Sequence, residues 1–144
     1  MIDTLVERMK KKGWENVYQK VKNYFIPHDQ VQLYRGYSTE VSFQFEDEAY
    51  DWVYIDAAHD YEGVMADIIA YSAKVKPGGY IAGHNYSPTE HSGVEVKQVV
   101  DLLFKDLLYV DSLSTNWIAY KRDLDIPVHI ENLWKMKKSE ASGP

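Results

Sequence analysis

A strand pattern, a helix pattern and a second strand pattern follow one another directly in the middle of this chain, and this succession constrains its fold most. The run WVYIDA at residues 52–57 is short and rich in β-branched and aromatic side chains, as expected of a strand buried on both faces of a parallel sheet. Asp60 can cap the next helix, in which helical spacing relates Val64, Ile68, Tyr71 and Val75. The turn KPGG at 76–79 then leads into the strand YIAGHNY at 80–86. Strands joined by crossover helices predict an α/β fold with a mostly parallel sheet.

The segments on both sides continue this alternation. Residues 14–25 have apolar side chains at helical spacing, and VQLYRG at 31–36 is predicted to be the first strand. Ser38 offers an N-cap for a short segment over residues 38–45, whose apolar pattern suits a helix or a strand; we favour the helix. A later helix is predicted from one apolar face, formed by Val96, Val99, Val100 and Leu103. The runs LLYVDSL and NWIAYKR near the end predict an antiparallel hairpin.

The composition limits the kinds of protein that this chain can be. Its 144 residues suffice for one domain, which we place at residues 1–136, with a flexible tail at 137–144. Because there is no cysteine, disulfides, thiolate zinc sites and cysteine nucleophiles are excluded. The net charge of −6 argues against nucleic acid as a partner. No apolar run is long enough to span a membrane and the N-terminus lacks the apolar centre of a signal peptide, so we expect a cytoplasmic protein without a membrane partner.

Polar side chains follow both central strands at the point where each strand ends. Asp56 and His59 come after the first of them, and His84 and Asn85 after the second. In parallel α/β sheets, ligands bind beyond the carboxyl ends of the strands. We therefore expect the two clusters to be neighbours in space and to form the functional site.

Two motifs and the hairpin carry a resemblance to a known family. The succession YDWVYIDAAHDYEGVMADI, then KVKPGGYIAGHNY, looks like the fourth and fifth strands of class I S-adenosylmethionine-dependent methyltransferases. Their closest branch has a D-x-x-H-x-Y run and a strand ending in G-H-D-Y, and includes metal-assisted O-methyltransferases. The hairpin LLYVDSLSTNWIAYK matches the antiparallel strand pair that closes that fold. The resemblance implies a Rossmann-like methyltransferase fold, truncated to its C-terminal two-thirds, with a mostly parallel sheet and a C-terminal antiparallel hairpin.

The resemblance also implies roles for the residues at the strand ends. S-adenosylmethionine would be the cofactor, and a small molecule or a sugar the acceptor of the methyl group. His59 would be the general base and Asp56 a ligand of the metal or the substrate, so that both are candidate catalytic residues. Asp56, His84 and Asn85 would hold a divalent metal, magnesium or manganese; the imidazole in this set would also suit iron or zinc.

The chain departs from the family pattern at two places. The glycine-rich turn that wraps the cofactor and the acidic residue that holds its ribose have no counterpart, as if the chain began where the second strand of the family fold ends. Asn85 stands where the branch has an aspartate, so a hard cation would bind more weakly. No cofactor-binding residue follows from the motifs, and we expect isolated monomers to bind S-adenosylmethionine weakly.

Structural roles compete with these functional ones. Asp56 can simply accept backbone hydrogen bonds at a strand end, and His59 can merely pack against the next loop. Three functions stay open: an active methyltransferase, a non-catalytic module or fragment needing a partner chain, and a metal-dependent enzyme of another class using Asp56, His59 and His84. The many tyrosines are interpreted as core packing with a hydrogen-bonding tip.

The missing strands make a prediction about the sheet. In the family fold, two strands separate the strand that matches VQLYRG from the strand that matches WVYIDA. Their absence would leave buried backbone groups unpaired. We expect VQLYRG to close up directly beside WVYIDA, or else a second copy of the chain, in a homodimer, to cover the exposed edge.

Overall fold

The computed structural model describes residues 13, 15–89, 91–132 and 136. The chain divides into two units, residues 1–35 and 36–144. The single domain predicted over residues 1–136 stays a prediction. The tail predicted at 137–144 lies outside the described residues.

The first unit contains one described helix, α2, at Glu15–Phe25. It confirms the helix predicted over residues 14–25, as far as that segment is described. Residues 31–35 form no strand, so the first strand predicted from VQLYRG is wrong. A strand is stable only when a neighbour satisfies its backbone groups, and the sheet formed by the described residues contains no strand from this segment.

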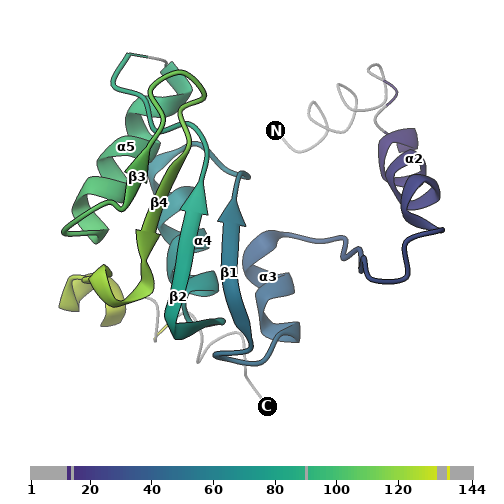
Figure 1. Cartoon of the computed structure of the whole chain (residues 1–144), viewed down its shortest axis with the longest axis horizontal. Helices are drawn as coiled ribbons and strands as arrows, with labels where there is room; N and C mark the ends of the chain where they lie inside the picture. Colours follow the sequence, from purple (N-terminus) through teal and green to yellow (C-terminus); the bar gives the residue numbers. More distant parts are fainter. Residues whose placement is uncertain (1–12, 14, 90, 133–135, 137–144) are drawn as a thin grey trace. The chain divides into compact units, whose positions relative to one another are not determined.

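The second unit is built on a four-stranded sheet with the order β1-β2-β4-β3 (Figure 1). Its strands are β1 at Tyr50–Ile55, β2 at Val75–Gly83, β3 at Tyr109–Val110 and β4 at Trp117–Tyr120. β1 and β2 are parallel, whereas β4 runs antiparallel to both β2 and β3. The α/β class, the parallel central strands and the C-terminal antiparallel hairpin are therefore confirmed.

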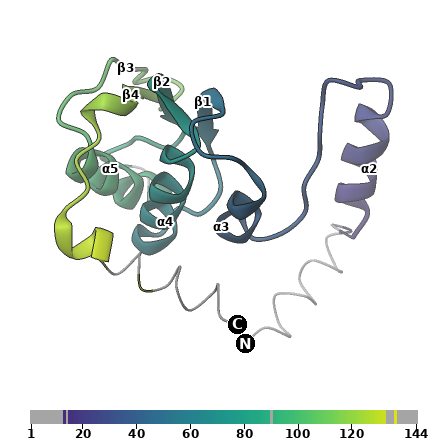
Figure 2. The same ribbon diagram turned by 90° about the horizontal axis from the view of Figure 1, so that it is seen from below.

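Two helices cover one face of this sheet. α4 at Tyr61–Ser72 and α5 at His91–Leu103 lie side by side on the same face in both views (Figures 1 and 2). Asp60 caps α4 as predicted, because its side chain accepts a hydrogen bond from the Gly63 backbone N–H. The core lies between the helices and the sheet, and its largest fully buried side chains are Trp117, Ile68, Ile81, Leu103, Val75, Val99 and Val100.

The short helix predicted over residues 38–45 is present, but its cap differs from the prediction. α3 spans Ser38–Val41, and a 3₁₀ turn continues it through Ser42–Gln44. The N-cap position is Tyr37, which makes no capping hydrogen bond through its side chain. Ser38 is instead the first helical residue and donates its hydroxyl hydrogen bond to Asp67 of α4. The predicted N-cap was wrong because the Ser38 hydroxyl group bonds the side chain of Asp67 in another helix instead of the backbone of its own helix.

The boundary between α4 and β2 also differs from the prediction. α4 ends at Ser72, and Val75 begins β2 instead of extending the helix. The KPGG segment is no separate turn; it lies within β2, where the pairing jumps from Tyr50↔Val75 to Trp52↔Tyr80. Gly79 permits this irregularity, since a Cβ there would lie 2.3 Å from the carbonyl oxygen of Asp51.

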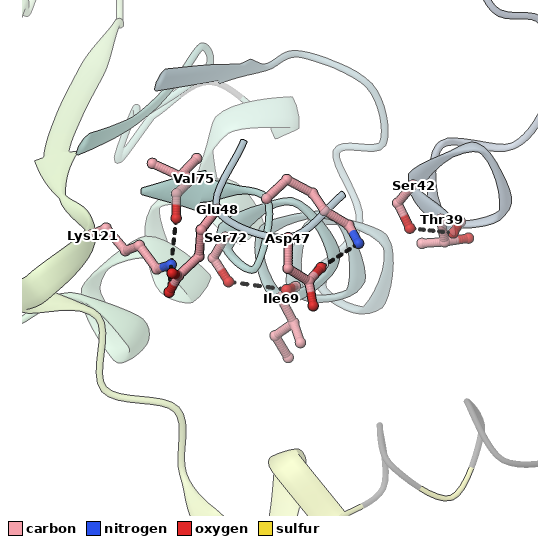
Figure 3. A network of polar contacts seen from close by, with 9 residues as sticks. Thr39, Ser42, Asp47, Glu48, Ile69, Ser72, Val75 and Lys121 are labelled. Carbon is pink, nitrogen blue, oxygen red and sulfur yellow. Dashed lines mark hydrogen bonds and ion pairs between the residues drawn. The ribbon is translucent and has the colours of Figure 1, made fainter. Parts of the chain in front are cut away.

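Ion pairs fasten the end of the sheet where β1 begins. Lys74, just before β2, is buried, and its Nζ lies 2.5 Å from Asp47 Oδ1. Lys121 donates a hydrogen bond to the carbonyl oxygen of Val75, and its Nζ is 3.7 Å from Glu48 Oε1 (Figure 3). Because Asp47 and Glu48 directly precede β1, these contacts hold the start of β1 beside the start of β2.

The other face of the sheet is open within the described part of residues 36–144. Trp52 is 60% exposed there and Tyr54 49%. Both line a groove of about 660 Å³, together with Tyr80, Ala82, Leu108, Tyr109, Asp111, Asn116, Trp117 and Ile118. The prediction that WVYIDA is buried on both faces is wrong, and so is the core role assigned to these tyrosines. In the described part of residues 36–144, helices cover only one of the two faces (Figure 2).

β1 lies at the edge of the sheet formed by the described residues. Because residues 31–35 form no strand, the predicted closure of VQLYRG onto β1 within one chain is wrong. Covering of the edge by a second copy stays a prediction.

Candidate active site at the carboxyl ends of the parallel strands

The carboxyl ends of β1 and β2 meet, as predicted. Ile55 pairs with Gly83, and the His84 backbone N–H donates a hydrogen bond of 3.2 Å to the Ile55 carbonyl oxygen. Glycine is required at position 83 because a Cβ there would come within 2.6 Å of that oxygen and within 2.8 Å of the Trp117 ring. The segments that begin with Asp56 and with His84 therefore leave the sheet side by side.

Asp56 and His59 form an exposed pair after β1. His59 Nε2 lies 3.4 Å from Asp56 Oδ1, and the two side chains are 39% and 49% exposed. A carboxylate can only accept, so this contact favours the ring proton on Nε2 and leaves the lone pair on Nδ1. Asp60 fixes the end of the loop by capping α4. The arrangement provides an oriented imidazole that can accept a proton from a bound hydroxyl group.

His84 and Asn85 bond each other after β2. His84 Nδ1 lies 2.8 Å from Asn85 Oδ1, and because an amide oxygen only accepts, the ring carries its proton on Nδ1. The remaining nitrogen, Nε2, is 3.4 Å from the hydroxyl oxygen of Thr115. Asn85 is buried and has a φ of 62°, a left-handed conformation that asparagine tolerates better than most residues.

A small cavity adjoins the β1 end of the site. It measures about 250 Å³ and is lined by Ser38, Val53, Tyr54, Ile55, Asp56, Ala57, Asp67 and Tyr71. The Tyr71 hydroxyl donates a hydrogen bond of 2.9 Å to the Ser38 carbonyl oxygen, so α3 and α4 are tied together beside it. Of the predicted site residues Asp56, His59, His84 and Asn85, Asp56 alone lines this cavity.

Asp67 is a site residue that the sequence reasoning missed. It is only 2% exposed, and its Oδ1 accepts the hydrogen bond from Ser38. Among the described residues, Oδ2 has no hydrogen-bond partner. Burial raises the pKa of Asp67, and Asp60 adds to this, whereas hydrogen bonds from Ser38 and the Ala58 backbone act against it. The sequence did contain a signal for Asp67, because this carboxylate lies between the apolar positions Val64 and Ile68 of the predicted helix.

The cavity is smaller than a site for a whole S-adenosylmethionine molecule. It measures about 250 Å³, against the ~300–1,000 Å³ typical of whole ligand sites. Two of its polar lining residues are engaged elsewhere, because the hydroxyl groups of Ser38 and Tyr54 donate hydrogen bonds to Asp67 and Asn116. No described strand ends in a glycine-rich turn that could wrap the cofactor.

The predicted metal ligands have other partners in this arrangement. Asn85 Oδ1 is engaged by His84 Nδ1, and the lone pair of His84 Nε2 is turned to Thr115. Over the described ranges, no group of three or more histidine, cysteine, aspartate or glutamate side chains is placed to hold a metal ion. These residues do not fit a resident cation as they stand. The metal site with Asp56, His84 and Asn85 stays a prediction.

The family profile of the methyltransferase domain matches residues 4–86, more than half of the chain. This match contains Asp56, His59, Asp67, His84 and Asn85. The chain belongs to the methyltransferase-domain family. The resemblance to class I S-adenosylmethionine-dependent methyltransferases and the truncated Rossmann-like fold are thereby confirmed. A search of curated proteins finds no match to the chain. Within the described residues of this methyltransferase-like protein, no helix is both long and apolar enough to cross a membrane.

Proposed function

We propose that this chain transfers a methyl group from S-adenosylmethionine to a hydroxyl oxygen of a small molecule or a sugar, with His59 as the general base. The family match supports the methyltransferase part of the proposal. The observation that carries the rest is the Asp56–His59 pair at the end of β1, where Asp56 also lines the cavity.

His59 would take the proton of the acceptor hydroxyl. With Nε2–H turned toward the Asp56 carboxylate, Nδ1 presents its lone pair to that hydroxyl group. Asp56 orients the ring and stabilises the imidazolium that forms when the proton arrives. When bound, S-adenosylmethionine would supply an electrophilic methyl group to the deprotonated oxygen; the sulfur–methyl bond would break and S-adenosylhomocysteine would leave.

Labelled methyl transfer tests this function directly. The full chain would be incubated with S-adenosylmethionine that carries a radioactive methyl group and with a panel of sugars and catechols. We expect label on an acceptor oxygen for the wild type, and a loss of about 100-fold or more for His59→Gln. Label on none of the hydroxyl compounds would contradict the proposal.

Cofactor binding tests a separate step. Calorimetric titration of the isolated chain with S-adenosylhomocysteine should give a high micromolar or weaker dissociation constant, because the glycine-rich turn and the ribose-binding acid are missing. A low micromolar or tighter constant for the monomer would contradict this expectation.

A non-catalytic module, or a fragment that needs a partner chain, is the second candidate. It is supported by the small cavity and by the free edge of β1. This alternative predicts neither methyl transfer nor S-adenosylhomocysteine binding by the isolated chain. A metal-dependent enzyme of another class would instead bind manganese without the cofactor, and the same titrations with and without manganese separate the three.

A further inference from the structure

The edge of β1 presents backbone groups of known direction. The Ile55 carbonyl oxygen accepts a hydrogen bond from His84, so the polar backbone groups of Ile55 point toward β2. Along a strand these directions alternate, so the N–H and C=O groups of Tyr54 point away from β2, and so do those of Trp52. No strand of the described part of the chain lies on that side. Trp52 and Tyr54 therefore offer free hydrogen-bonding groups at the edge.

This edge lacks the usual protection against pairing. Within residues 52–55 there is no proline, glycine or lysine, and the side chains of Trp52 and Tyr54 are exposed. The one irregularity of β1 lies before Trp52 and leaves this stretch regular. Natural proteins cover or charge such edges, so an uncovered one is a pairing surface.

We infer that β1 pairs antiparallel with β1 of a second copy of this chain, about a two-fold axis at Val53. This centre suits the direction of the free groups, because it sets Trp52 opposite the partner subunit's Tyr54 and Tyr54 opposite the partner subunit's Trp52. Each pair exchanges backbone hydrogen bonds, while Val53 faces the partner subunit's Val53 in a pair without hydrogen bonds. Two copies then form one continuous sheet.

The side chains favour a second copy over an unrelated strand. Trp52 and Tyr54 line the same groove and so lie on one face of the sheet. The two-fold axis pairs each with the other aromatic residue, which is among the most favourable of cross-strand pairs. Asp51 would lie opposite the partner subunit's Ile55, and its charge is already paired with Lys76, with 2.6 Å between Lys76 Nζ and Asp51 Oδ1. The axis thus brings no like charges face to face.

The first test is the oligomeric state of the full chain. Sedimentation velocity over a range of concentrations should show a monomer–dimer equilibrium. Trp52→Lys combined with Tyr54→Lys places like charges opposite each other twice, so the dissociation constant should rise by about 10-fold or more. Both side chains are exposed, so the fold should tolerate the change. Tyr109→Lys, an exposed aromatic residue on the opposite edge strand, is the control and should dimerise like the wild type.

Mixing charge variants tests whether the edge pairs with itself. The double lysine variant should not self-associate, nor should the matching variant with Trp52→Glu and Tyr54→Glu. Mixed together, they should form a heterodimer, because each lysine then faces a glutamate. A wild-type chain that stays monomeric, or a dimer that both double variants leave intact, would overturn the proposal.

The register has its own test. The chain has no cysteine, so Val53→Cys introduces a single thiol at the proposed axis. The Cα atoms of such a pair lie about 4.5 Å apart, within the range of a disulfide. Mild oxidation should produce a covalent dimer from Val53→Cys and none from Tyr109→Cys. Dimers that form in solution but do not crosslink through position 53 would refute this register.

Discussion

The two strand ends that form the candidate site hold their polar side chains very differently. After β1, Asp56 and His59 are partly exposed. Asp56 Oδ1 lies 3.4 Å from His59 Nε2, which is long for a hydrogen bond. After β2, His84 and Asn85 make a 2.8 Å hydrogen bond, and Asn85 is buried.

This difference separates residues available for chemistry from residues that shape the site. A ring nitrogen of histidine has one lone pair, and once that lone pair accepts a hydrogen bond it is not available to a substrate or a metal. His59 retains one on Nδ1, whereas both nitrogens of His84 have partners. We therefore assign the chemistry to the β1 end and a structural role to the β2 end.

The largest expected effect is on methyl transfer. His59→Gln removes the proposed base and should lower kcat by about 10²–10⁴-fold. His84→Gln should lower it by less than about 10-fold, because that ring acts on the reaction only through its neighbours. Both variants should bind S-adenosylhomocysteine like the wild type. Equal losses of kcat in the two variants would remove the distinction between the strand ends.

The free energy of unfolding should show the opposite order, with larger losses for changes at Asn85 than for a change at His59. Asn85→Ala loses the bond to His84 and places an alanine in a left-handed conformation, at a cost of about 1–3 kcal/mol in the free energy of unfolding. Asn85→Gly loses the same side-chain contacts but adopts the left-handed conformation without strain, so its loss should be smaller. His59→Ala should change stability by less than about 0.5 kcal/mol. Urea denaturation measures all three, and a His59→Ala loss as large as that of Asn85→Ala would break the comparison.

A pH titration should isolate the buried carboxylate near the β1 end. Because burial raises the pKa of Asp67 above the ordinary value of 3.8, the folded chain binds this proton more tightly than the unfolded chain. The stability it contributes is fully present below pH 3.8 and is lost as pH rises through the folded pKa. As the pH rises over this range, the melting temperature of Asp67→Asn should therefore fall less than that of the wild type. Asp51→Asn, at an exposed carboxylate, is the control, and parallel curves for Asp67→Asn and wild type would argue against the raised pKa.

The smallest effect concerns the metal. If manganese recruits Asp56, His84 and Asn85, it must first displace the His84–Asn85 bond, so its dissociation constant should be high. At a manganese concentration equal to the wild-type dissociation constant, the melting temperature should rise by about 1–2 °C. Asp56→Ala should abolish this gain, and Asn85→Asp should enlarge it by restoring a charged ligand. The same gain in all three proteins would mean that manganese binds elsewhere.

Local pattern was sufficient for much of the fold. The spacing of Val96, Val99 and Leu103 predicted α5, and the alternation of strand and helix predicted the parallel pair. The adjacency of the strand ends that precede Asp56 and His84 followed from that pair, since parallel strands end at the same edge. These features depend on the period of a segment and on the handedness of crossovers, both of which are properties of the chain itself.

What the local pattern could not contain was the identity of each neighbour. VQLYRG has the composition of a strand, yet no adjacent strand satisfies its backbone groups in the described sheet. WVYIDA has the composition of a buried strand, yet within the described part of residues 36–144 helices cover only one of its faces. Ser38 bonds Asp67 and His84 bonds Asn85 because packing brings these groups together. Burial, pairing and hydrogen-bond partners are relations between segments, so only the tertiary structure decided them.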